Sequence, residues 1–269
     1  MVQYVIQRDG TTEEFSSDKL NKWAEWASDS CGVSWSDVLL TAVKAMPDTI
    51  STADIHRSLI KTCIEMKDKG HVKMAARLLV GQIYKEAFGD YSIPSLKDYY
   101  HEMVDAGHWD FMGYSDDALD QLDTVIDHTK DFTYEYATVR QFYDKYAISV
   151  GGVCLESPQM MMMGLAMSNN RGGHLYEVVA AYKAISDLKI NLPTPTLNGE
   201  RTTLQSSPSC CVITGGDTTE SIGAATMVAY EMTGARAGIG IEYATRSIND
   251  PVKGGRVSHT GKFPLYAFV

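Results

Sequence analysis

The chain has 269 residues, of which 44% are hydrophobic and 22% charged, with a formal net charge of −10 and a pI near 5.1. These proportions predict a globular protein of one large or two smaller domains, and the acidic charge argues against nucleic acid as the main partner. The five cysteines are odd in number and scattered, which predicts no disulfide framework and favours a reducing cytoplasm.

Targeting segments, membrane spans and metal centres are not predicted. The N-terminus alternates apolar and polar residues, unlike a signal peptide. No apolar run approaches the roughly 20 residues of a membrane helix, and no Cys/His pair has zinc-ligand spacing. We therefore expect no membrane partner and no metal bound by this chain.

The first ninety residues predict a β-hairpin followed by four helices. Val2, Tyr4 and Ile6 alternate with polar neighbours, and a turn at Asp9-Gly10 leads to a second strand over 11–15. Apolar periodicity and capping residues then predict the helices, which run from Ser16 or Ser17 to about Gly32, over 34–46, from Ser51-Thr52 through Ile64, and over 71–88. Leu20, Trp23 and Ala27 would face the core from the first helix.

Several ordered blocks of this segment resemble the ATP-cone, a regulatory nucleotide-binding domain. They are Val5–Gly10, Asp18–Leu20, Thr52–His56, Ala75–Leu78 and Lys85. The resemblance implies a site for ATP or dATP with magnesium. The cations Arg8, Lys19 and Lys85 would bind the phosphates. Glu13, Thr52 and His56 would lie near the nucleotide. The alternative is that these are solvated surface charges. Gln7 stands where the cone usually carries a lysine, and one cation fewer would weaken phosphate binding.

Residues 91–189 read as mostly helical, with helices over 95–104, 116–122, 134–146, 158–167 and 175–188. The Met160–Met163 run points all round its helix, so we interpret it as packing rather than a metal or partner site. His128 could be a ligand or a base, although a structural histidine with satisfied hydrogen bonds is favoured.

From about residue 190 the pattern changes to strands punctuated by proline and glycine. Pro193 and Pro195 predict an extended stretch from Leu192 to Thr196. A short apolar strand then ends at Gly215-Gly216, a helix is predicted over 218–233, and a second strand over 234–242. Gly238-Ile239-Gly240 lacks the third glycine of a dinucleotide fingerprint, so these glycines indicate close approach of the backbone to a ligand.

This last part resembles the start of the catalytic barrel of the class Ia-like ribonucleotide reductase large subunit. The blocks that carry the resemblance are Leu192–Pro195, Ser209-Cys210, Gly216-Asp217, Arg236–Gly240, Pro251–Gly255 and His259–Gly261. Segments 126–128, 133–146 and 156–160 resemble the helical region before that barrel. The resemblance implies a mainly α N-terminal part and an incomplete ten-stranded α/β barrel, divided as an ATP-cone (1–90), a helical region (91–189) and the start of the barrel (190–269).

The same resemblance implies roles for individual residues in ribonucleotide reduction. Cys210 would be a redox thiol facing the ribose 2′-hydroxyl, while Cys211 alternates to the other side of the strand and packs. Substrate contacts are implied for Thr194, Ser209 and Gly238. A site for a deoxynucleotide specificity effector is implied for Asp217, Arg246 and Lys253.

The family's radical cysteine and second redox cysteine would lie beyond residue 269. We therefore expect a component of a split large subunit, inactive alone and completed by a second polypeptide. The further partners would be a small subunit with a di-iron site and tyrosyl radical, and thioredoxin or glutaredoxin. The alternatives are a free-standing nucleotide-binding module, a remnant without catalysis, or an engineered truncation. A transcriptional repressor with an ATP-cone is disfavoured by the acidic charge and the lack of a zinc ribbon.

Overall fold

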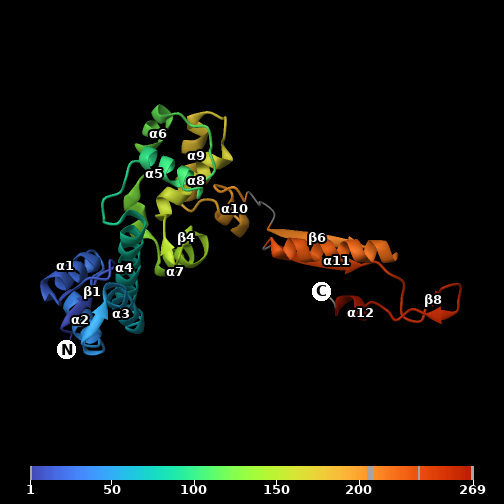
Figure 1. Ribbon diagram of the computed structural model, residues 1–269, viewed down its shortest axis with the longest axis horizontal. Helices are drawn as coiled ribbons and strands as arrows, with labels where there is room; N and C mark the ends of the chain where they lie inside the picture. Colours follow the sequence, from blue (N-terminus) through green and yellow to red (C-terminus); the bar gives the residue numbers. More distant parts are fainter. Residues whose placement is uncertain (1, 205–208, 236, 268–269) are drawn as a thin grey trace. The chain divides into compact units, whose positions relative to one another are not determined.

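A computed structural model describes residues 2–204, 209–235 and 237–267, and this part of the chain divides into two compact units, Met1–Ile190 and Asn191–Val269 (Figure 1). The segments expected over 1–90 and 91–189 lie in the same unit. Arg236, which contributes to the resemblance, is outside the described residues. Within the described ranges, no helix is both long and apolar enough to cross a membrane.

The first unit begins with a small sheet in the order β2-β1-β3. The hairpin of β1 (Tyr4–Ile6) and β2 (Thr12–Glu14) confirms the prediction from alternation. β3 (Thr49–Ser51) was not predicted, because three residues are too few for a periodic signal. It pairs in parallel with β1, which places the buried side chains of Val5 and Ile50 opposite each other.

The predicted N-terminal helices are present as α1 (Ser17–Ser28), α2 (Trp35–Lys44), α3 (Thr52–Glu65) and α4 (Lys69–Phe88). Each helix begins at a capping side chain that accepts a hydrogen bond from a backbone N–H in the first turn. The capping residues are, in order, Ser16, Ser34, Ser51 and Asp68. Gly89 ends α4 in the left-handed region, at φ 76°. Trp23 differs from the prediction, because Ala24 takes the buried position and Trp23 is half-buried.

The rest of the first unit contains α5 (Leu96–Asp105), α6 (Asp116–Asp123), the 3₁₀ helix η1 (His128–Thr133), α7 (Tyr136–Gln141), the π-helix η2 (Phe142–Tyr146), α8 (Pro158–Asn169) and α9 (Leu175–Ser186). A short hairpin of β4 (Ser149–Val150) and β5 (Val153–Cys154) follows η2. The single helix predicted over 134–146 is therefore replaced by α7 and a π-helical turn. The sequence signalled neither η1 nor the hairpin.

The core of this unit is centred on α8, where every side chain from Pro158 to Ser168 is buried. A helix that is apolar on all sides has no face to offer to water and is stable only inside the fold. Met160–Met163 are between 0% and 8% exposed. Their prediction as packing residues is confirmed.

The second unit contains α10 (Thr194–Gly199), β6 (Cys210–Gly215), α11 (Thr219–Gly234), β7 (Gly238–Tyr243), the hairpin β8 (Pro251–Val252) with β9 (Val257–Ser258), and α12 (Phe263–Tyr266). The extended stretch predicted from Leu192 to Thr196 is wrong beyond Pro193, since α10 starts at Thr194. Pro195 occupies the first turn of this helix, where a missing N–H costs no hydrogen bond.

β6 and β7 are parallel neighbours joined through α11. This strand–helix–strand arrangement is the repeating unit of an α/β fold. The described residues contain no closed barrel. The predicted fold class, mainly α at first and then the opening strands and helix of an α/β barrel, is confirmed.

Candidate functional site

A cavity of about 840 Å³ opens in the first unit between the small sheet and its helices. Four residues predicted for a nucleotide site line it: Glu13, Lys19, Thr52 and His56. They come from β2, α1 and α3, so only the folded unit brings them together. This is the size of cavity that takes a small-molecule ligand.

Glu13 organises the polar side of the cavity. The Lys19 Nζ donates to both carboxylate oxygens of Glu13 at 2.9 Å, and Gln7 Nε2 donates to Oε1 at 2.5 Å. Gln7 lines the cavity as well. Gln7, which stands where the ATP-cone usually has a lysine, therefore donates to the same carboxylate as Lys19.

Arg8 and Lys85, the other predicted phosphate-binding cations, are not among the residues that line the cavity, but both act on residues that do. Burial and then the charge of Arg8 lower the pKa of His56 to about 4. Lys85 Nζ lies 5.7 Å from the ring centre of Tyr91, another lining residue. Both cations are thus near enough to influence the cavity without forming its wall.

Aromatic rings form a further wall that sequence reasoning missed. Trp23 stacks on Trp26 with ring centres 4.6 Å apart and on Tyr91 at 5.2 Å, and lies 5.1 Å from the His56 ring. Gly81 in α4 leaves room for it, because a Cβ there would come 2.2 Å from Trp23 Cη2. Two tryptophans one turn apart, opposite a glycine inside a long helix, were the available signal.

The second unit presents a different arrangement on the β6–β7 pair. Cys210, Val212 and Gly238 are exposed on the open face, while Cys211 is half-buried on the alternate side of β6, where α11 packs against the strand pair. Gly238 N donates to Ser209 O at 2.7 Å. A Cβ at Gly238 would lie 3.3 Å from the Cys210 sulfur, so the glycine keeps the space beside the thiol open. Thr194 begins α10, outside this face.

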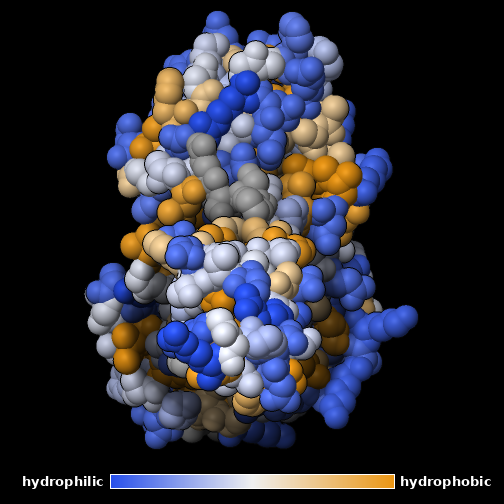
Figure 2. Space-filling view, turned by 90° about the vertical axis from the view of Figure 1, so that its right-hand side faces the viewer, coloured by the Kyte–Doolittle hydropathy of each residue, from blue (hydrophilic) through white to orange (hydrophobic). Residues whose placement is uncertain are grey.

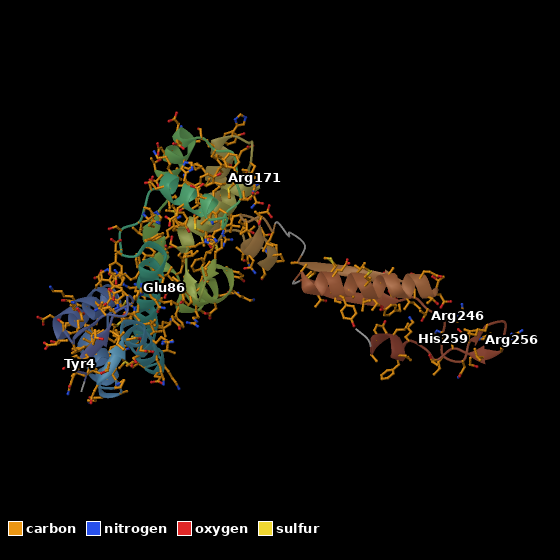
Figure 3. All side chains as sticks on the ribbon, in the orientation of Figure 1. Tyr4, Glu86, Arg171, Arg246, Arg256 and His259 are labelled. Atoms are coloured by element: carbon orange, nitrogen blue, oxygen red, sulfur yellow. The ribbon has the colours of Figure 1, made fainter. Side chains whose placement is uncertain are left out.

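Asp217 and Arg246 are brought together where β6 and β7 end. Arg246 donates to Asp217 through its backbone N at 3.1 Å and its Nε at 2.7 Å. These hydrogen bonds hold the pKa of Asp217 below its usual value. Lys253 is exposed in the turn between β8 and β9, with φ 51°. Arg246 and His259 lie near each other in Figure 3, and the charge of His259 also acts on Asp217.

Metal ligation finds no support in the described ranges, where no group of three or more His, Cys, Asp or Glu side chains is placed to hold an ion. The free thiols of Cys31, Cys63 and Cys154 are buried. Burial raises the pKa of Cys63 to about 12, so that thiol is protonated and unreactive at neutral pH.

Comparison with known families matches two segments of the chain. Residues 3–86 match the ATP cone domain, and residues 131–205 match the all-alpha domain of ribonucleotide reductase. The first match contains the sheet, α1–α3 and all but the last two residues of α4. The second begins inside η1 and ends in the second unit.

Curated relatives are similar over nearly the whole chain. It is 36% identical to ribonucleoside-diphosphate reductase 1 subunit alpha of Escherichia coli (strain K12) over 97% of its length. The subunit alpha of Haemophilus influenzae is 33% identical over 98% of the chain, and that of Enterobacteria phage T4 is 30% identical over 97%. The chain spans 36%, 37% and 36% of these three relatives.

The fold and these matches define the class of protein: an ATP cone followed by the all-alpha domain of ribonucleotide reductase. More particularly, the chain corresponds to the N-terminal portion of a class Ia-like ribonucleoside-diphosphate reductase alpha subunit. The predicted resemblance is confirmed.

Proposed function

We propose that this chain is the N-terminal component of a ribonucleotide reductase large subunit that reduces ribonucleoside diphosphates to deoxyribonucleotides. The observation that carries the proposal is the open face of β6–β7, where Cys210 stands beside the backbone of Gly238. Because Gly238 has no side chain, the space beside the thiol is open to a substrate.

The reaction proposed for this face is reduction of the ribose 2′-hydroxyl after a radical is generated at C3′. Two thiols each give up one hydrogen and form a disulfide, the 2′-hydroxyl leaves as water, and a hydrogen takes its place. Cys210 would be one thiol of the pair. Ser209 and Gly238 would hold the substrate beside it, and Thr194 would hold its phosphate.

The second redox thiol and the radical cysteine would come from further polypeptide, which we propose is a second chain. Three of the other cysteines are buried and Cys211 turns to the α11 side of β6. Hydrophobic patches reach the surface in Figure 2, and the strongly exposed apolar residues in the described part of the second unit include Leu204, Val212, Met227, Ile248 and Phe263. Exposed apolar surface of this kind favours a covering partner.

Nucleotide effectors would bind at two places. The cone cavity would take ATP or dATP with magnesium, with Glu13, Lys19, Thr52 and His56 at its wall and Arg8 and Lys85 nearby. Asp217, Arg246 and Lys253 would bind a deoxynucleotide specificity effector. A radical-bearing small subunit, with its di-iron site and tyrosyl radical, and a thioredoxin or glutaredoxin system would complete the cytoplasmic enzyme.

Replacing Cys210 tests this function in the assembled enzyme. The chain, the polypeptide that completes the barrel and the small subunit are combined, and deoxyribonucleotide formation from a ribonucleoside diphosphate is measured over many turnovers. Cys210→Ser is expected to abolish turnover, because serine cannot form the disulfide. Cys211→Ser is the matched control and should retain most activity; sustained turnover by Cys210→Ser would refute the redox assignment.

A second candidate function is a free-standing nucleotide-binding module. It is favoured by the position of the cavity, whose lining residues all belong to the first unit. Tagging the chain in its native cells and identifying what copurifies by mass spectrometry separates the two. A stoichiometric partner that carries the remaining barrel supports the enzyme, whereas a chain recovered alone with ATP supports the module.

A further inference from the structure

The cavity of the cone has one wall that does not belong to the cone. The match to the ATP cone domain ends at residue 86, yet Tyr91, Ile93, His128, Thr129 and Phe132 also line the cavity. Three of these residues lie on η1. A ligand that fills the cavity therefore lies between the cone and the region that follows it.

Unpaired nitrogen atoms gather around the same cavity. Among the described residues, the buried side-chain nitrogens without a hydrogen-bond partner are Trp23 Nε1, His56 Nδ1 and His128 Nδ1. All three residues line the cavity. Buried polar atoms are nearly always paired, so their concentration here points to a ligand as the missing partner. Each nitrogen is buried, so it also lacks access to bulk water as a partner.

The chemistry of these groups favours an uncharged, flat ligand over a phosphate at this end. Burial lowers the pKa of His128 and, with Arg8, that of His56, so both imidazoles are neutral at pH 7. A neutral imidazole offers one donor and one acceptor, and an indole offers a donor. The stacked rings of Trp23 and Trp26 add an aromatic surface. A heteroaromatic base has the complementary edge and face.

η1 also connects the cavity to the core. The Phe132 ring lies 5.6 Å from the rings of both Trp26 and Tyr84, and the Arg77 guanidinium lies 5.1 Å from Trp26 and 5.5 Å from Phe132. The residue before Phe132, Asp131, is fully buried and accepts hydrogen bonds from Tyr84 at 2.8 Å and from Gln159 on α8 at 3.1 Å. Neighbouring residues of η1 thus touch the cavity and the central helix.

We propose that the nucleotide site of the cone is composite: the base lies between the tryptophan wall and η1, and the His128 side chain hydrogen-bonds its edge. This inference rests on the proposed binding of ATP or dATP by the cone. The 3₁₀ helix η1 would then also couple the site to the core, because nucleotide binding would shift Asp131, which accepts a hydrogen bond from Gln159 of α8. His128 is then a ligand-binding residue, where the sequence favoured a structural histidine with satisfied hydrogen bonds.

Calorimetric titration of the full chain with magnesium ATP tests the composite site. His128→Ala is expected to weaken binding about threefold to tenfold, the effect of one uncharged hydrogen bond. His128→Asn, whose amide can take the place of the imidazole nitrogen, should bind as the wild type does. His101→Ala is the control, since His101 lies outside the cavity wall and pairs with Asp116.

The His128 variants should keep the native fold, because Tyr84 donates to the backbone carbonyl of His128 and not to its side chain. Unchanged thermal unfolding of each variant without nucleotide checks this. In the wild type, ATP should also slow amide hydrogen exchange across residues 128–133. This second readout needs no variant.

Titration with adenosine, which has the base but no phosphates, tests the contacts to the base alone. Lys19→Ala should weaken ATP but not adenosine, whereas His128→Ala should weaken both. Wild-type ATP affinity in His128→Ala, or no change in exchange at η1, would overturn the composite site and leave nucleotide binding by the cone intact. Failure of the wild type to bind ATP would overturn both.

Discussion

Two glycines inside helices face tryptophan rings, and their surroundings differ. Gly81 in α4 faces Trp23, which lines the cavity, and Gly164 in α8 faces Trp109, which is 1% exposed. A Cβ would come 2.2 Å from the first ring and 2.6 Å from the second. The same added methyl group therefore meets a ring that can move in one case and a packed ring in the other.

Alanine at these two glycines should have opposite consequences for stability and binding. Overpacking costs about 1–3 kcal/mol, and alanine regains up to about 1 kcal/mol of helix propensity. With the full gain counted, Gly164→Ala should lower the free energy of unfolding by up to about 2 kcal/mol. Gly81→Ala should leave it nearly unchanged while ATP affinity falls, because Trp23 moves into the cavity. Urea unfolding and calorimetry measure both; equal stability losses would contradict this account.

At the scale of elements, a buried polar network joins α4, η1 and α8. Tyr84, Asp131 and Gln159 come from these three elements in that order, and Tyr182 of α9 donates to Gln159 Oε1 at 2.6 Å. Burial raises the pKa of Asp131 to about 7. Between about pH 4 and 7 the folded chain therefore holds a proton at Asp131 that the unfolded chain has released.

This proton sets the sign of a pH dependence. The Asp131 contribution to stability is fully present at low pH and is lost as pH rises towards 7, by at most about 1.4 kcal/mol per pH unit. Asp131→Asn cannot titrate, so the stability of the variant relative to the wild type should rise between about pH 4 and 7. His56, with its pKa lowered to about 4, contributes the opposite slope, and His56→Gln is the matched comparison. Urea unfolding at stepped pH measures the slopes; parallel curves for Asp131→Asn and the wild type would contradict a raised pKa.

At the scale of the molecule, the two compact units hold separate chemistry. Every residue that lines the cavity lies between Val5 and Phe132, inside the first unit, whereas Cys210, Asp217 and Arg246 lie in the second. The first unit has its own apolar core around α8, which is the physical requirement for folding without the second.

A fragment ending at Ile190 should therefore fold and bind magnesium ATP with the affinity of the full chain. A fragment ending at Asp90 would lack Tyr91 and the η1 wall, so we expect it to bind about threefold or more weakly even if folded. Circular dichroism establishes folding, and calorimetry compares the three affinities. Equal affinity in the shortest fragment would place the whole site inside the cone.

The sequence by itself determined much of this protein. Helix periodicity and caps located α1–α4, and alternation located the β1–β2 hairpin, because both signals are local and repeat along the chain. The all-round apolar character of the Met160–Met163 helix predicted its burial. Ordered short blocks predicted the family, since several residues at fixed spacing carry more information than any one of them.

Only the tertiary structure decided where the remaining side chains act. β3 depends on a parallel partner far along the chain, β1. Trp23 fits a core position by periodicity, but the space left by Gly81 turns it into a cavity wall. His128 fits a structural role by composition, but packing places it unpaired beside the cone. Contacts between distant segments decide such roles, and a local pattern carries no record of them.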